Sequence, residues 1–225
     1  MAESKSKAGT WRSVFVLLLA FGPAIILILI ATSHCKHKFK RLDDFGVIPK
    51  YEFTTSSGKK ITNNTFKNDI VIFTTIQPTC PDSCGISIWH LDQLIFQITR
   101  SKKRLKHIKI VSIVTDYYGN PSNNLKDVEF SLKDRVDGYN PDMWLVVKGD
   151  PKQIYNIENN GVNLIHKSNE FFGGISYQEL MLLADKKNHI RMIVSGKTED
   201  SMRTMRDYMS LLEREYKQNE IKDKE

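Results

Sequence analysis

The chain has 225 residues, of which 40% are hydrophobic and 26% charged, so it is long enough for one folded domain with additional segments. Its formal net charge is +7, and residues 1–44 contribute +4 of this, from seven Lys or Arg against three Asp or Glu. The remaining +3 is too small for the strongly basic surface of a nucleic-acid-binding domain, and we expect no nucleic-acid partner.

An apolar segment near the N-terminus predicts a membrane anchor. Val14 to Ala31, "VFVLLLAFGPAIILILIA", is 18 residues without a charge, the length of a transmembrane helix. A cleaved signal peptide is the alternative, although its apolar region is shorter, about 7–15 residues. We therefore expect an N-terminal tail over residues 1–13, an anchor in the lipid bilayer over 14–32 and a basic tether over 33–44. Three basic residues precede the span and four follow it, so charge does not decide the orientation.

A mixed pattern of strands and helices follows the tether. Alternating and β-branched runs predict strands, and apolar residues at helical spacing predict helices. Near residue 150, "DPKQ" predicts a helix start with a capping box between Asp150 and Gln153. The predicted elements are a hairpin over 51–53 and 60–62, a strand over 69–75, a helix along 88–98, a strand over 108–114, a helix over 124–134, a strand over 143–147, a helix from 150, a hairpin over 180–185 and 190–195, and a helix from 198 with Met202, Met205, Met209, Leu212 and Tyr216 on one face.

This order predicts the fold class. Strands that alternate with helices form parallel sheets through right-handed crossovers, and a closing antiparallel hairpin with a C-terminal helix completes a thioredoxin-like outline. We expect an α/β, thioredoxin-like domain with an N-terminal β-hairpin over residues 45–218, preceded by the single transmembrane helix. A charged tail over 219–225 ends the chain.

Two of the three cysteines form the candidate site. Cys80 and Cys84 lie between a predicted strand and a predicted helix, about one helical turn apart. A helix N-terminus stabilises a thiolate, and thiolates are soft ligands that favour Cu(I). The same spacing permits a disulfide, while two inert buried thiols remain the simplest alternative. Zinc is disfavoured because it normally takes four ligands and no second cysteine pair exists.

Several segments resemble the Sco/SenC family of membrane-anchored thioredoxin-fold proteins. "FTTIQPTCPDSCGISIWHLDQL" is similar to the family's strand and CPxxC segment, and "IKIVSIVTD" to its strand ending in Asp, here Asp116. "MWLVVKGDPKQIYNI" and "LMLLADKKNHIRMIVSG" resemble its later strand–helix segment and closing hairpin. The likeness spans about residues 45–216, with an anchor in front as in the family.

The resemblance implies a function in copper handling. Family members deliver copper to the dinuclear copper site of cytochrome c oxidase, and some reduce disulfides. They bind Cu(I) through two cysteines and a distal histidine, and the two cysteines carry over to Cys80 and Cys84. The expected histidine position falls on Tyr177 or Ser176, so His166, eleven residues before Tyr177, is the candidate substitute. The resemblance also implies a single-pass protein of the bacterial inner membrane with its domain on the periplasmic side.

The remaining histidines are weaker candidates. His90 lies six residues after Cys84, about 120° away around a helix, and is expected to face elsewhere. His107 and His189 are expected at the surface, and His34 and His37 flank Cys35 in the tether. Three functions remain open: a copper metallochaperone that serves the copper-bearing oxidase subunit or another periplasmic thiol or copper protein, a thiol-disulfide oxidoreductase or redox sensor, and an interaction platform without chemistry. Only the second would be an enzyme.

Overall fold

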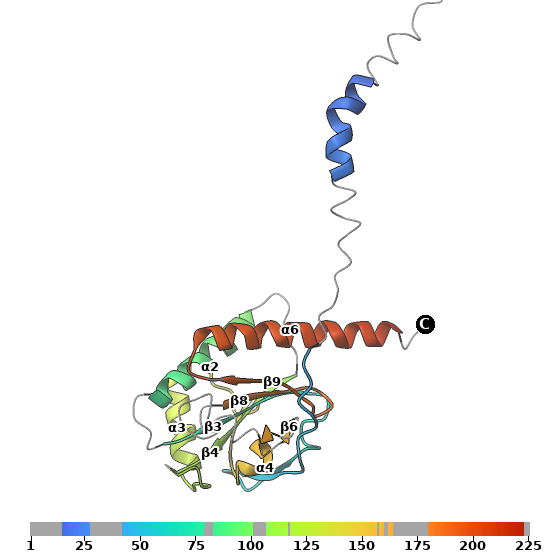
Figure 1. The fold of residues 1–225 in the computed structure, drawn as a ribbon. Helices are drawn as coiled ribbons and strands as arrows, with labels where there is room; N and C mark the ends of the chain where they lie inside the picture. The colour runs from blue at the N-terminus through green and yellow to red at the C-terminus, as the bar shows by residue number, and fades with distance from the viewer. Residues whose placement is uncertain are drawn as a thin grey trace, which may run out of the picture. The chain divides into compact units, whose positions relative to one another are not determined.

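The computed structural model divides the chain into two compact units, Met1–Arg41 and Leu42–Glu225. In the first unit, a helix covers residues 15–27 (Figure 1). No helix in the part of the chain that the structure describes is long and apolar enough to cross a membrane. The described residues are 15–27, 42–78, 83–100, 107–116, 118–156, 158–159, 162–163 and 180–222.

The second unit is built on a seven-stranded sheet in the order β2-β1-β5-β4-β3-β8-β9. The three central strands β3, β4 and β5 are parallel, while β1 joins β5 and β8 joins β3 in antiparallel pairs. The strands are β1 (Glu52–Thr55), β2 (Lys60–Thr62), β3 (Ile70–Ile76), β4 (Ile108–Val114), β5 (Trp144–Lys148), β8 (Leu180–Ala184) and β9 (Ile190–Ser195); β6 (Glu158–Asn159) and β7 (Val162–Asn163) form a separate pair.

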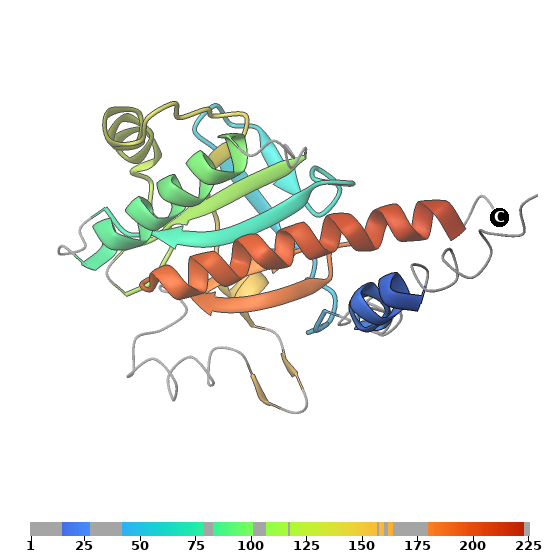
Figure 2. The same cartoon turned by 90° about the horizontal axis from the view of Figure 1, so that it is seen from above.

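Helices cover both faces of this sheet. They are α2 (Ser83–Arg100), α3 (Leu125–Arg135), α4 (Lys152–Tyr155) and α6 (Glu199–Lys222). Apolar residues of α2, α3 and α6 share one core with Ile70, Ile72 and Ile76, whereas α4 shares the second core with Val71 and Phe73. Alternate residues of β3 therefore enter opposite cores, as the two-residue period of a strand requires. Figures 1 and 2 show α2 and α6 side by side on the first face.

The predicted elements are confirmed in type and order. The strand over 108–114 has the predicted bounds, and both hairpins form, each with strands of the expected sequence. Met202, Met205, Met209 and Leu212 are all buried on one face of α6. The small β6–β7 pair was not predicted, because strands of two residues leave no periodic signal.

The capping box predicted at residue 150 is wrong for one of its two members. The Asp150 carboxylate accepts a hydrogen bond from the Lys152 N–H at 2.9 Å, as an N-terminal cap does. The Gln153 side chain instead accepts one from the Glu52 N–H at 3.0 Å, across 101 residues of sequence. A long-range backbone donor on β1 thus replaces the local donor that the motif would use.

Candidate thiol site at the carboxyl ends of the parallel strands

The candidate site lies where β3 leaves the sheet. β3 ends at Ile76 and α2 begins at Ser83, so Cys84 is in the first helical turn, beyond the carboxyl end of a parallel strand. Open α/β sheets bind ligands at this edge, and a helix N-terminus favours a thiolate. Cys80 and the side chain of Cys84 lie outside the described residues, so their use remains a prediction from the sequence.

The neighbouring strand ends in a closed loop around Asp116. Its carboxylate accepts hydrogen bonds from the N–H groups of Tyr118 and Asn120, both at 2.8 Å, and from the Asn120 side-chain amide at 3.1 Å. These donors, the Asn120 N–H foremost, outweigh desolvation and hold the pKa of Asp116 below its ordinary value. Asp116 is therefore an ionised residue that shapes the loop beside the site.

The residue before it has a different environment. Thr115 is fully buried, and its N–H donates to the Ile76 carbonyl at 2.9 Å, which joins the ends of β3 and β4. Its side-chain hydroxyl has no hydrogen-bond partner among the residues that the structure describes. An unsatisfied buried hydroxyl is energetically costly, so this edge of the sheet contains a polar group that its own strands do not satisfy.

The register of β8 brings the chain after Tyr177 to the same edge. β8 pairs with β3 through Phe73 and Leu182, and continuing this antiparallel register places Leu180 beside Thr75, one residue before the end of β3. Tyr177 precedes Leu180 by three residues, a reach of about 10 Å. Tyr177 and His166 both lie outside the described residues. The register places the start of β8 at the edge where β3 ends, and a position of residue 177 near the thiols stays a prediction from the family pattern.

Leu180 itself is held by a buried tyrosine. The fully buried Tyr155 hydroxyl of α4 donates to the Leu180 carbonyl at 2.8 Å. This bond ties the start of β8 to the second core.

The described histidines lie apart from one another. His107 is exposed, as predicted, and its ring is 3.5 Å from Asp69. His189 is partly buried, less exposed than predicted, because its Nδ1 contacts the Asp44 carboxylate at 2.9 Å. His34 and His37 lie outside the described residues. Within the described ranges, no three His, Cys, Asp or Glu side chains gather as metal ligands would.

His90 is the histidine whose role sequence reasoning missed. It is only 6% exposed, and its Nε2 is 3.2 Å from the Lys197 carbonyl in the turn between β9 and α6. A carbonyl only accepts, so Nε2 carries the proton. That His90 faces away from Cys84 stays a prediction, because the Cys84 side chain lies outside the described residues. Sequence reasoning missed the contact with Lys197 because a partner 107 residues away leaves no local signal.

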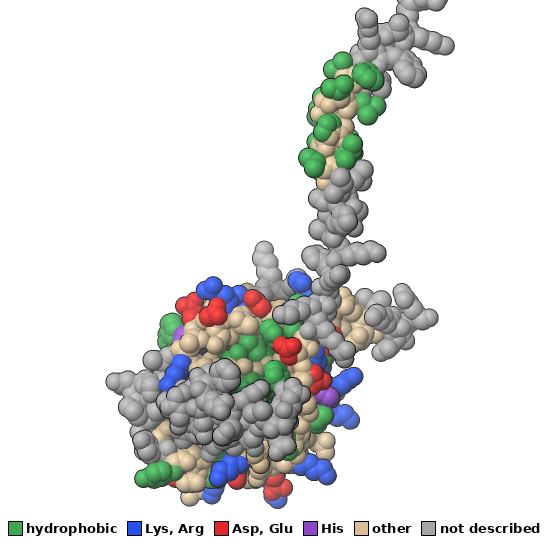
Figure 3. Space-filling model, viewed as in Figure 1, with side chains coloured by type: hydrophobic (Ala, Val, Ile, Leu, Met, Phe, Trp, Pro, Cys, Tyr) green, Lys and Arg blue, Asp and Glu red, His purple; other side chains and the backbone are tan. Residues whose placement is uncertain are grey.

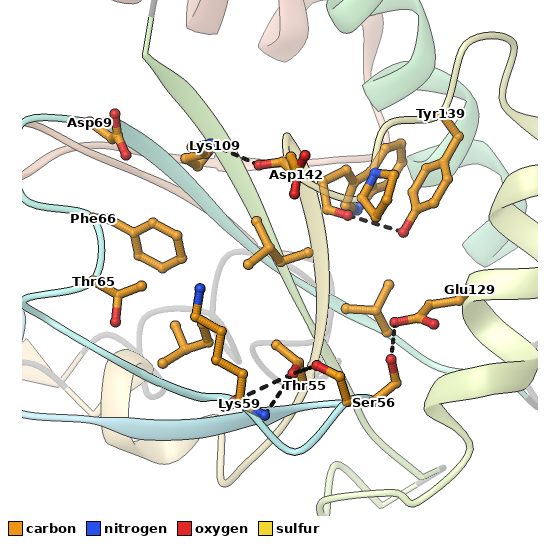
Figure 4. A pocket seen from close by; sticks show the side chains of 16 residues that line it. Thr55, Ser56, Lys59, Thr65, Phe66, Asp69, Lys109, Glu129, Tyr139 and Asp142 are labelled. Atoms are coloured by element: carbon orange, nitrogen blue, oxygen red, sulfur yellow. Dashed lines mark hydrogen bonds between the residues drawn. The ribbon is translucent and has the colours of Figure 1, made fainter.

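A separate hollow of about 650 Å³ lies at the opposite end of the sheet, where β4 and β5 begin (Figure 4). Its polar groups mainly satisfy one another. Ser56 donates to Glu129 at 2.6 Å, Lys109 to the Asp142 carbonyl at 2.8 Å, and Tyr139 to the Trp144 carbonyl at 3.0 Å. It contains none of the predicted site residues and does not compete with the thiol edge as the candidate site.

The surface of the second unit mixes charges of both signs. Figure 3 shows basic and acidic side chains interspersed on the visible face, without a continuous basic stripe. This distribution agrees with the small net charge beyond residue 44.

The sequence matches no protein-family model and no curated protein. The fold is similar to that of BsSco, a member of the Sco family of cytochrome c oxidase assembly proteins in which a disulfide switch was identified. The TM-score is 0.53 at 12% identity, covering 77% of this chain and 96% of BsSco. The SCO1/SenC family lipoprotein of Bacillus anthracis str. Ames is similar at a TM-score of 0.52 and 14% identity, covering 76% and 97% of the two chains.

Arabidopsis thaliana ScoI, whose structure contains copper, has the same similarity, with a TM-score of 0.52 and 13% identity over 75% of this chain and 99% of ScoI. At these identities the likeness establishes the fold. The resemblance found in the sequence is thus confirmed at the level of structure: the chain has the thioredoxin-like α/β fold of the Sco/SenC proteins.

Proposed function

We propose that this protein is a membrane-anchored Cu(I) metallochaperone that uses Cys80 and Cys84 and supports assembly of the copper site of cytochrome c oxidase. The observation that carries the proposal is the position of Cys84, in the first turn of α2 beyond β3, on the fold of Sco proteins. Copper is the cargo. ScoI of Arabidopsis thaliana, which shares the fold, holds copper.

The chemistry of the residues suits this cargo. Thiolates are soft ligands, and the helix N-terminus favours the thiolate form of Cys84. The third ligand would come from the segment before β8, because Leu180 starts at the edge where β3 ends. Tyr177 offers a neutral phenol, which is a harder and weaker Cu(I) ligand than an imidazole. His166 is the alternative donor from the same segment.

The proposed location follows from the N-terminal unit. Over residues 15–27 nine large apolar side chains, from Phe15 to Leu27, are more than half exposed, a surface that lipid would cover (Figure 3). We therefore place the span 14–32 in the bacterial inner membrane, with the thioredoxin-like domain on the periplasmic side. The copper-bearing oxidase subunit, or another periplasmic thiol or copper protein, would be its partner there.

The first described residues of the second unit are bound to the start of β9. The Phe45 N–H donates to the Ile190 carbonyl at 2.8 Å, at the start of β9. That start lies beside Ala184, which pairs with Val71 near the amino end of β3. Phe45 thus lies at the end of the sheet opposite to the first turn of α2.

A Cu(I) competition titration of the reduced full chain in detergent micelles tests the proposal. The parent is compared with Tyr177→His and with Phe130→His, which adds a histidine at an exposed position of α3 as the matched control. We expect one Cu(I) per chain and tighter binding by Tyr177→His alone. Absence of Cu(I) uptake by both the parent and Tyr177→His would refute the metallochaperone.

A thiol-disulfide oxidoreductase is the second candidate, favoured by the tyrosine at position 177 and by the disulfide switch of BsSco. Disulfide exchange requires only the thiol pair and access to it. A Cys84→Ser variant would then trap a mixed disulfide through Cys80, and the Cys80→Ser, Cys84→Ser variant would trap none. If neither variant traps a partner, exchange is excluded.

A further inference from the structure

A groove of about 230 Å³ lies between residues 89–97 of α2 and 199–206 of α6. It begins at the same edge of the sheet as the candidate thiol site. α6 follows β9, whose last residue, Ser195, pairs with Leu180 at the edge where β3 ends. Figure 2 shows the starts of α2 and α6 at the same end of the domain.

The floor of this groove is apolar and preformed. Leu94 and Met202, which both line it, are 2% and 5% exposed and belong to the first core. His90 also lines it and is fixed by the contact of its Nε2 with the Lys197 carbonyl at 3.2 Å. Core packing and this hydrogen bond hold the groove in shape, so a partner would not have to order these side chains on binding.

One large aromatic side chain stands at the rim. Trp89 lines the groove and is 55% exposed, while its ring packs edge-on against His90 with 5.0 Å between the ring centroids. A single exposed aromatic residue is common on protein surfaces. This one borders a preformed apolar groove, and tryptophan is enriched among the residues that contribute most to binding between proteins. Trp89 therefore has the position and chemistry of an interface anchor.

The exposed side of α2 also has the composition of an interface. Among the side chains of α2 that the structure describes, none of the exposed ones is Lys, Asp or Glu; they are Trp89, Phe96, Gln97, Thr99 and Arg100. By contrast, α3 exposes five charged residues, which are Lys126, Asp127, Lys133, Asp134 and Arg135. Aromatic residues and arginine are enriched in protein interfaces, whereas Lys, Asp and Glu are depleted.

The charges around the groove favour an acidic partner. Arg203 pairs with Glu199 at 3.2 Å, and Arg206 with Asp207 at 3.4 Å. All four side chains are more than one-third exposed, so these pairs are weak and a carboxylate of a partner could replace either acid. Arg100 lies over the Phe96 ring at 4.2 Å and forms no ion pair with the residues that the structure describes. Three cations thus face two anions on this surface.

We propose that the α2–α6 surface, formed by Trp89, Phe96, Arg100, Arg203 and Arg206 around the groove, docks an acidic surface of the copper-bearing oxidase subunit. The inference rests on the proposed function, which supplies the identity of the partner. Trp89 is five residues after Cys84, about 7.5 Å along the helix axis. A partner bound at this surface therefore lies beside the helix that carries Cys84, and the surface recognises the partner without contacting the cargo.

Binding of the full chain in detergent micelles to the purified copper-bearing subunit, followed by biolayer interferometry, tests the proposal. Both proteins are free of copper, so docking is measured apart from transfer. Trp89→Ala removes the anchor, and Phe130→Ala, at an exposed aromatic residue of α3, is its matched control. The variant Arg203→Gln, Arg206→Gln removes two cations from the groove; its control, on the exposed side of α3, is Lys133→Gln, Arg135→Gln.

We expect Trp89→Ala to raise the Kd at least about tenfold, as the loss of an anchor does. The double arginine variant should slow association about two- to tenfold at low salt and less at high salt, because charges at a rim steer the encounter. Both α3 controls should match the parent. Gln97→Glu places a carboxylate beside Arg206, to which Gln97 now accepts at 2.9 Å, and should also weaken binding. This exposed substitution keeps the test decisive if Trp89→Ala does not fold.

The inference is overturned if the parent does not bind the subunit, or if Trp89→Ala and Gln97→Glu bind as the parent does. Self-association of the parent that Trp89→Ala abolishes would assign the surface to a second copy of the chain and would also overturn it. Cu(I) titration of the parent separates the two proposals. A parent that takes up no Cu(I) refutes the metallochaperone, while docking that depends on Trp89 still supports the surface. A parent that takes up Cu(I) and docks equally well without Trp89 refutes the surface alone.

Discussion

Replacement of Arg191 tests how the start of the domain is held. The Arg191 guanidinium is buried and donates to the Asp185 carboxylate at 3.0 Å, to Glu215 at 3.2 Å and to the carbonyls of Asp43 and Leu42 at 2.9 and 3.4 Å. One side chain of β9 thus links the β8–β9 turn, α6 and the first residues of the domain. Arg191→Met keeps most of the aliphatic stem and removes all of these donors.

The size of the loss follows from the burial of the partner. The Asp185 side chain is 5% exposed, and removing one member of a buried ion pair costs about 3–5 kcal/mol because the other charge stays buried. Asp185 still accepts the N–H groups of Lys187 and His189 at 2.8 and 2.9 Å, and Glu215, at 28% exposure, can turn to water. We therefore expect the lower end, about 3 kcal/mol, or about 6–12 °C in Tm for a domain of this size.

Urea unfolding of the full chain in detergent micelles, followed by circular dichroism, measures this loss. The double variant Arg191→Met, Asp185→Asn removes both charges and should lose only about 1 kcal/mol relative to the parent. In both variants the N–H groups of Phe45 and Ile190 should exchange faster, because the first residues of the domain are released. A loss below about 1 kcal/mol in Arg191→Met, or equal losses in the single and double variants, would refute a buried charge as the cause.

Three further variants test other contacts. The Gly46 N–H and His189 outweigh desolvation and lower the pKa of Asp44. The ionised Asp44 therefore stabilises the fold above its ordinary pKa of 3.8, and this contribution is lost as pH falls through the folded pKa. Asp44→Asn should make stability less dependent on pH below about 4, and an unchanged acid-unfolding curve would contradict this. Tyr155→Phe should cost about 1–2 kcal/mol, because it leaves the Leu180 carbonyl without the Tyr155 donor. Proteolysis before β8 should also become faster. Tyr118→Phe, at an exposed position, is the control. Gly196→Ala should cost only about 1 kcal/mol, because the added methyl overlaps the end of the Met181 side chain, which can rotate away. Gly58→Ala, where no atom lies within 4 Å, should cost only the strain of its positive φ. A loss above about 2 kcal/mol in Gly196→Ala would show that Met181 cannot yield.

Much of the fold could be predicted because its elements carry their own periodic patterns. Strand β4 was predicted with its bounds, since "IKIVSIV" is a mostly apolar run of the kind that parallel strands buried on both faces require. The buried face of α6 follows from methionines and a leucine spaced by three and four residues. Turn residues between these runs, such as the glycine of "SSG", whose φ is +82°, separate one element from the next.

The candidate site could likewise be predicted only in part. The sequence placed Cys84 at a helix start after a strand, and the structure confirms that backbone position. The partner of Gln153, the burial of His90 and the closeness of Gly196 to Ser87 were not foreseen, because each depends on residues about 100 positions apart in the chain.

The sequence by itself determined the order of strands and helices, the cysteine pair and its place in that order, because hydrophobic periodicity and turn chemistry act over neighbouring residues. Only the tertiary structure decided which segments meet at the carboxyl end of β3. The antiparallel pairing of β8 with β3 brings Leu180 to that edge, and packing against α2 brings the β9–α6 turn beside His90. These contacts depend on the register of a seven-stranded sheet and on burial in a shared core, which no local sequence pattern encodes.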